Sequence, residues 1–172
     1  GDNTDAFFPH YALTDDQPGH IFDDALRSAG NTNDYRGKIL RIHPEPDGSY
    51  SIPKGNLFPK GTDSTKPEIY IMGVRNPYRL AIDPETNYLY WGEVGPDGAK
   101  DSTRGPMGYD EFNQAREAGN FGWPLMIGNN QAYNHVYFED NERIGEKFDT
   151  LHPVNFSRNN TGLRNLPPAH PA

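Results

Sequence analysis

Cysteine, positive charge and long apolar runs are absent or scarce in this chain of 172 residues. The absence of cysteine excludes disulfides, zinc–thiolate sites, iron–sulfur clusters and a cysteine nucleophile. Lys and Arg number 16 against 24 Asp and Glu, a net charge of -8, so no cationic excess is available to neutralise phosphates. No apolar run approaches the ~18 residues of a membrane span. We therefore expect neither a nucleic-acid partner nor a membrane span.

Turn-forming residues are abundant instead. The chain contains 18 Gly, 16 Pro and 16 Asn, which supply positive φ angles, fixed φ angles and Asx turns more often than strand or helix interiors. Aromatic residues make up 12% of the chain, and large rings bury the area that disordered segments lack. The composition predicts an ordered protein with a small core and long loops.

Alternation of apolar and polar residues predicts a run of short strands. Residues 68–74, 78–82 and 88–94 are expected to form three successive antiparallel strands, separated by a corner and a turn, and residues 110–115 a fourth. Four short strands in ~50 residues are typical of one β-propeller blade.

The rest of the chain divides into three regions. Residues 1–34 are expected to be a loop region, 35–124 to carry the blade motifs, and 125–172 to be loop-rich, with its last twenty residues extended on a surface. Residues 38–42 and 50–52 are expected to pair as a hairpin. At ~40–50 residues per blade, the chain supplies about two to three blades, which cannot close a ring. The predicted fold class is all-β, an incomplete propeller with little helix, whose open edges are covered by the terminal loops, by another copy or by the remaining blades.

Arg75 and Asn76 precede Pro77 at the corner between two predicted strands. Rigid strands would present a planar cationic fork and an amide that both donates and accepts, a pair suited to a carboxylate-bearing ligand. The alternative is a structural corner, in which Asn76 makes an Asx turn and Arg75 pairs with Glu93.

Oxygen donors gather after the third strand. Gly95 and Pro96 place carbonyl groups on a turn, and Asp110 and Glu111 follow in the next strand. Calcium takes six to eight oxygen ligands, many of them from the main chain. The alternative is a solvated acidic loop, since no EF-hand spacing is present.

Histidine offers little support for catalysis. The six His residues are scattered, with no pair at i and i+4 and therefore no zincin motif. His20, in an acidic loop, could act as a base, but a surface role is the commoner fate of such a residue. No Gly-x-Ser-x-Gly motif and no phosphate-binding glycine loop occurs.

Six motifs in order resemble the glucose/sorbosone dehydrogenase family, whose best-known members are soluble quinoproteins on a six-bladed propeller. They are Arg36-Gly37-Lys38-Ile39-Leu40-Arg41-Ile42, Ile52-Pro53 with Asn56, Arg75-Asn76-Pro77, Gly95-Pro96, Tyr109-Asp110-Glu111 and Gly119-Asn120-Phe121-Gly122-Trp123-Pro124. The resemblance runs from the first residues to about Pro124. It implies a sugar substrate, pyrroloquinoline quinone (PQQ) and calcium.

The resemblance also implies site residues. Arg75 and Asn76 would contact PQQ, and the carbonyl groups of Gly95 and Pro96 would bind the calcium that polarises the quinone.

A second, structural calcium is implied at Asp110, Glu111 and the carbonyl of Phe121, although the spacer between Pro96 and Asp110 looks long for the family. The family's general-base His and its other cationic cofactor ligands have no counterpart here, so no catalytic residue is assigned.

The leading hypothesis is the central part of a secreted or periplasmic PQQ- and calcium-dependent sugar dehydrogenase-like propeller, inactive as an isolated chain. The alternative is a non-catalytic propeller that binds carbohydrate or acts as a scaffold in a multidomain secreted protein.

Overall fold

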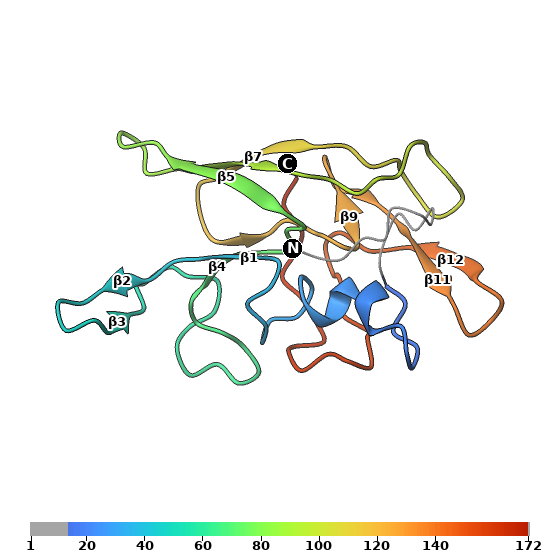
Figure 1. Cartoon of the computed structure of the whole chain (residues 1–172), viewed down its shortest axis with the longest axis horizontal. Coiled ribbons are helices and arrows are strands. Elements are labelled where there is room, and N and C mark those ends of the chain that lie inside the picture. Colours follow the sequence, from blue (N-terminus) through green and yellow to red (C-terminus); the bar gives the residue numbers. More distant parts are fainter. Residues whose placement is uncertain (1–13, 172) are drawn as a thin grey trace.

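The computed structural model describes residues 14–171, in which short strands and loops dominate (Figure 1). Two 3-10 helices occur near the start, η1 (Ile21–Asp23) and η2 (Ala25–Arg27). The strands are β1 (Lys38–Leu40), β2 (His43–Pro44), β3 (Tyr50–Ser51), β4 (Ile69–Met72), β5 (Pro77–Ile82), β6 (Leu89–Glu93), β7 (Glu111–Ala115), β8 (Gly119–Asn120), β9 (Met126–Ile127), β10 (Gln131–Ala132), β11 (Asn134–Tyr137) and β12 (Arg143–Lys147). Within these described residues no helix could cross a membrane. The prediction of an all-β chain with long loops and little helix is confirmed, and the strands form several small sheets.

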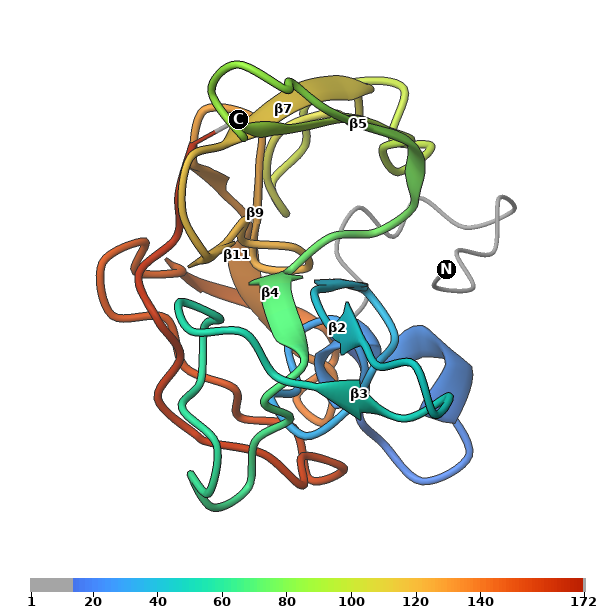
Figure 2. The same ribbon diagram turned by 90° about the vertical axis from the view of Figure 1, so that its left-hand side faces the viewer.

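The first three-stranded sheet has the order β1-β4-β8. β4 pairs antiparallel with β1 and parallel with β8. All four residues of β4 are buried, because Ile69 and Met72 belong to one core cluster and Tyr70 and Ile71 to another. A continuously apolar strand with both faces covered lies at the centre of the molecule (Figure 2).

The second three-stranded sheet is the antiparallel meander β5-β6-β7, which lies at the top of Figure 1. Leu89, Trp91 and Glu93 of β6 are buried, whereas Tyr90 between them is exposed. The strands near 78–82, 88–94 and 110–115 are confirmed. The expectation that residues 68–74 begin this meander is wrong, because β4 pairs with β1 and β8 instead.

The predicted hairpin between residues 38–42 and 50–52 is also wrong in its pairing. β3 pairs with β2, and β1 pairs with β4. Both residues of β2 and of β3 are exposed, so this hairpin buries little, whereas β1 gains a fully buried neighbour in β4. Burial therefore selects the long-range partner of β1.

The C-terminal part is more integrated than the sequence suggested. Two hairpins, β9–β10 and β11–β12, lie in the predicted loop-rich region. Beyond them Leu166 and Ala169 are buried, so the expectation of a purely superficial tail is wrong. Ala169 bridges Asn120 in parallel, and the His170 N–H donates to the Asn120 carbonyl over 2.7 Å. The tail thus covers the open edge of β8, as expected for a terminal segment.

Candidate functional site

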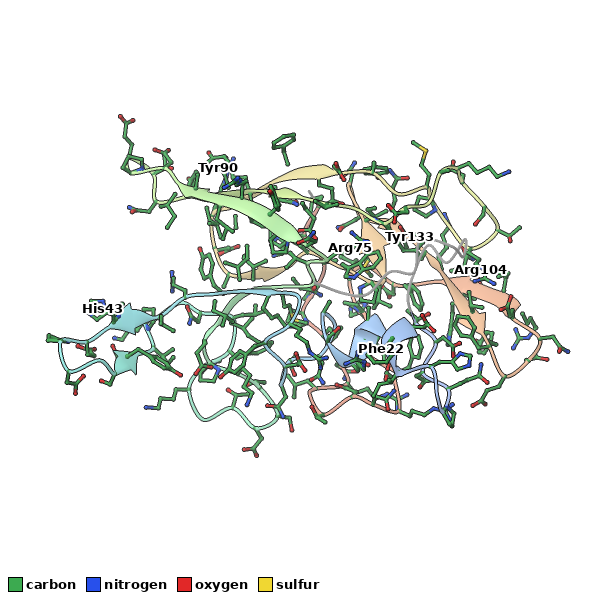
Figure 3. All side chains as sticks on the ribbon, viewed as in Figure 1. Phe22, His43, Arg75, Tyr90, Arg104 and Tyr133 are labelled. Carbon is green, nitrogen blue, oxygen red and sulfur yellow. The ribbon has the colours of Figure 1, made fainter. Side chains whose placement is uncertain are left out.

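A four-residue corner, 73–76, joins β4 of the first sheet to β5 of the second. The Glu93 carboxylate, at the end of β6, accepts hydrogen bonds from the backbone N–H groups of Arg75 and of Asn76, the latter over 3.4 Å. The Arg75 guanidinium donates to the Val94 carbonyl over 2.9 Å. The expected pairing of Arg75 with Glu93 therefore exists, but it runs through the Arg75 main chain. Figure 3 places Arg75 near the middle of the molecule.

Glu93 is a buried acid, 7% exposed. Its other carboxylate oxygen accepts from the Trp91 indole N–H over 2.9 Å. Burial raises the pKa of Glu93 to about 7 against these hydrogen bonds, and the charge of Glu111 adds to the increase. Glu111 lies directly opposite Glu93 in the β6–β7 pairing, where two like charges are unfavourable. A proton or a cation between the strands would relieve this repulsion.

The Gly95–Pro96 turn follows β6 and packs main chain against main chain. A Cβ atom on Gly95 would lie 2.0 Å from the Tyr109 carbonyl oxygen, and one on Gly108 would lie 1.7 Å from the Pro96 carbonyl oxygen. Only glycine fits either position. The Asp110 carboxylate accepts from the Gly95 N–H over 3.0 Å, so Asp110 supports this turn directly.

A cavity of about 10 Å³ lies between the corner, the turn and β7. Its lining residues are Gly73, Arg75, Glu93, Gly95, Pro96, Glu111, Phe121, Trp123, Met126 and Ile127. Five of the seven predicted site residues, namely Arg75, Gly95, Pro96, Glu111 and Phe121, therefore share one cavity. Asn76 and Asp110 do not line it, although each is next in sequence to a residue that does.

Glu111 and Phe121 are each held in place by contacts with neighbouring segments. Glu111 accepts from the Gly128 N–H over 2.6 Å and from the Asn113 side-chain amide over 3.1 Å. The Phe121 ring packs edge-on against Trp91, with 4.7 Å between ring centroids. The bond from Gly128 ties β7 to the residue after β9, and the ring contact holds the segment after β8 against β6.

The cavity suits an ion and not a quinone. A volume of about 10 Å³ holds roughly one water-sized particle. Its lining residues include the acids Glu93 and Glu111, and carboxylate oxygens are donors that calcium prefers. Across residues 14–171 no three His, Asp or Glu side chains gather at one point, so a cation here needs main-chain oxygens as well. The cavity is too small for a quinone ring system. Beside it, Asn76 is half-buried and Val94 is exposed.

The candidate base His20 does not line this cavity. Its side chain is 52% exposed, and its Nδ1 atom lies 2.6 Å from the Asp15 carboxylate. The surface role considered for it from the sequence matches this placement. Glu93, by contrast, appeared in the sequence analysis only as a partner for Arg75. The alternation of β6 was the available signal, since it places residues 89, 91 and 93 on one buried face.

Comparisons with known proteins agree on one family. The family described as Glucose / Sorbosone dehydrogenase matches residues 18–158. HIPL2 protein of Arabidopsis thaliana is 33% identical over 131 residues, 69% of this chain and 17% of that protein. Quinoprotein glucose dehydrogenase B of Acinetobacter calcoaceticus is 36% identical over 103 residues, 60% of this chain and 18% of that protein.

Among solved structures, the soluble aldose sugar dehydrogenase of Escherichia coli in the apo form is 33% identical, with a TM-score of 0.42. The match covers 58% of this chain and 24% of that one. The chain spans less than a fifth of the length of the two curated relatives above.

Proposed function

The chain belongs to the glucose/sorbosone dehydrogenase family, and on that premise we propose that it forms the central part of a PQQ- and calcium-dependent sugar dehydrogenase-like propeller. The observation that carries the proposal is the shared cavity, which brings Arg75, Gly95, Pro96 and Glu111 together from three separate stretches of sequence. The related protein named quinoprotein glucose dehydrogenase B supports the choice of a quinone cofactor.

Two calcium positions follow from this proposal. The carbonyl groups of Gly95 and Pro96 would hold the ion next to the quinone, and Asp110, Glu111 and the Phe121 carbonyl would hold a structural ion. Gly95, Pro96, Glu111 and Phe121 line one cavity that has room for a single ion, so only one of these two positions can lie inside it. A cation there would also offset the repulsion between Glu111 and the neighbouring Glu93.

Arg75 and Asn76 would bind and orient the cofactor, Arg75 by balancing carboxylate charge. PQQ, when bound, supplies a hydride acceptor for oxidation at C1 of a sugar. The sugar hydroxyl proton must go to a base, and a well-placed base contributes about 10²–10⁴ in rate. His20 does not line the cavity and is bound to Asp15. Since no His of the sequence stands in a context that matches the family's base, we propose that the base comes from outside this chain.

A non-catalytic propeller that binds carbohydrate or acts as a scaffold is the second candidate. The burial of Arg75, 8% exposed, and its bond to the Val94 carbonyl favour it, because a guanidinium turned toward main chain can serve the fold alone. In either case we propose a secreted or periplasmic protein.

An anaerobic dye-reduction assay with several aldoses, PQQ and calcium tests the proposal on this chain and on the full-length protein that contains it. We expect turnover by the full-length protein and none by the isolated chain. Arg75→Ala in the full-length protein should weaken PQQ binding by about 1.5–3 kcal/mol, the usual value of a charge-assisted contact. A full-length protein that binds PQQ but oxidises no sugar would favour the non-catalytic candidate. Turnover by the isolated chain at the full rate would place the base within it and make His20 the first residue to replace.

A further inference from the structure

The corner at 73–76 has an unusual support. Two successive backbone N–H groups, those of Arg75 and Asn76, point at one carboxylate oxygen of Glu93. The other oxygen is bound by the Trp91 indole. The carboxylate therefore has donors on both oxygens, and it lies on a different strand from the corner that it holds.

The end of β6 is tied to the corner a second time. The Val94 N–H donates to the Asn76 carbonyl over 3.1 Å, and the Val94 carbonyl accepts from the Arg75 guanidinium over 2.9 Å. Gly95 and Pro96 follow Val94 directly. Glu93 thus sets the position of two neighbouring features together, the corner that carries Arg75 and Asn76 and the start of the Gly95–Pro96 turn.

We propose that Glu93 is the positioning residue of this site: through the N–H groups of Arg75 and Asn76, its carboxylate sets the direction in which these two side chains meet the cofactor. This inference rests on the proposed function for the identity of the ligand. Glu93 is not assigned any contact with the quinone, the metal or the sugar.

The hydrogen bonds to Glu93 favour its carboxylate form over the protonated acid. All three groups that donate to Glu93 are N–H groups, so both of its oxygens accept. Glutamine would keep one acceptor and turn an NH₂ group toward a donor, leaving either the Trp91 indole N–H or the two corner N–H groups without a partner. Charge-assisted hydrogen bonds are also roughly twice as strong as neutral ones. Glu93→Gln therefore changes the contacts while keeping the size of the side chain.

Glu68→Gln is the matched control. Glu68 is also a buried acid, 9% exposed, and it accepts a hydrogen bond from the Tyr50 hydroxyl over 2.9 Å. It does not line the cavity beside the corner. Both variants replace a glutamate that is less than 10% exposed by its amide, so a general effect of this replacement on stability should appear in both.

Two measurements are needed. Hydrogen exchange in this chain reports the protection of the Arg75 and Asn76 amides, and the amides of β4 show whether each variant is folded. Titration of the full-length protein with PQQ in calcium, followed by the absorbance of the quinone, reports affinity. We expect Glu93→Gln to deprotect the two corner amides and to weaken PQQ binding roughly ten- to hundredfold. Glu68→Gln should change neither.

Unchanged corner amides or unchanged PQQ affinity in a folded Glu93→Gln variant would overturn the positioning role. Equal loss of affinity in Glu68→Gln would do the same, because it would make the effect one of general stability. If the unsubstituted full-length protein bound no PQQ, the proposed function itself would fail, and the cofactor role of Glu93 would fail with it. Exchange of the corner amides would then still decide whether Glu93 holds the corner.

Discussion

The two three-stranded sheets differ in how much of their surface is buried by the rest of the chain. In β1-β4-β8, all four residues of β4 are buried, and core clusters lie on both sides. In β5-β6-β7, Leu89 and Trp91 share a cluster with the first sheet, but Leu80 and Ile82, which pair with them on the same face, are exposed. On the opposite face, Phe112 of β7 is 93% exposed. The central strand of the first sheet is therefore covered on both faces. The second sheet exposes apolar side chains on both of its faces, as a blade in an unclosed propeller would.

The candidate site lies where these two sheets join. The corner leaves the fully buried β4 and enters the half-covered β5, and Glu93 of β6 holds it in place. A rigid strand on one side gives the corner a fixed origin, which a binding site needs. The burial of β4 therefore supports the geometry of the site even though the second sheet is only partly covered.

The largest difference between the two sheets should appear when a side chain is truncated, because the loss of stability depends on how deeply the side chain is buried. Ile71→Ala, in a fully buried position of β4, should lower the free energy of unfolding by about 2–5 kcal/mol through lost burial and a residual cavity. Ile82→Ala, at a position of β5 that is 66% exposed, should change it by no more than about 0.5 kcal/mol. Urea unfolding followed by circular dichroism measures both. Equal losses would mean that the second sheet is covered in solution, for example by another copy.

Calcium should reduce the difference in stability between the two sheets, because its proposed ligands lie at the ends of β6 and β7 in the second sheet. At roughly one hundred times its dissociation constant, an ion that binds only the folded state adds about 2.7 kcal/mol. Melting in millimolar calcium and in chelator measures the gain. Asp110→Asn with Glu111→Gln should remove a structural-site effect and leave any effect of the carbonyl site. Superimposable melting curves for the unsubstituted chain would argue against any site tighter than millimolar.

The exposed face of the second sheet should promote self-association. Sedimentation velocity over a wide concentration range should show larger species as the concentration rises, and Phe112→Ser should reduce them with little change in stability. Leu151→Ser is the control, since Leu151 is also exposed, at 64%, but lies outside both sheets. A chain that stays monomeric throughout would contradict this prediction.

The smallest of the expected effects is a dependence of stability on pH, and it arises outside both sheets. His135 of β11 stacks between Tyr137 and Phe156, with 4.3 Å between centroids on each side. Burial lowers the pKa of His135 below its usual 6.5, and the positive charge of Arg143 lowers it further, while Asp16 opposes the shift.

The unfolded chain therefore takes up a proton at His135 before the folded one does. The stability that neutral His135 contributes is fully present above pH 6.5 and is lost as the pH falls through the folded-state pKa. His135→Phe should keep the stacking and make unfolding less dependent on pH between 7 and 5. Identical pH profiles for the two proteins would show that burial of His135 does not matter.

Local sequence patterns predicted much of this molecule because they depend on neighbours in the chain. The alternation in residues 88–94 places β6 within one residue at each end, and the turn residues mark the limits of β5. The seven site residues came from four of the six motifs that resemble one family. Five of them line one cavity, which no spacing rule could have shown.

Strand partners and the support of the site were decided by tertiary structure. β1 and β3 are close in sequence, yet β1 pairs with β4, because only β4 offers it a fully buried neighbour. The local sequence pattern predicts only that Glu93 is one more inward-facing residue of an alternating strand. Its role at the corner depends on two backbone N–H groups 17 and 18 residues earlier in the chain. Alternation determines which face a side chain occupies, whereas burial over long sequence separations determines what that face meets.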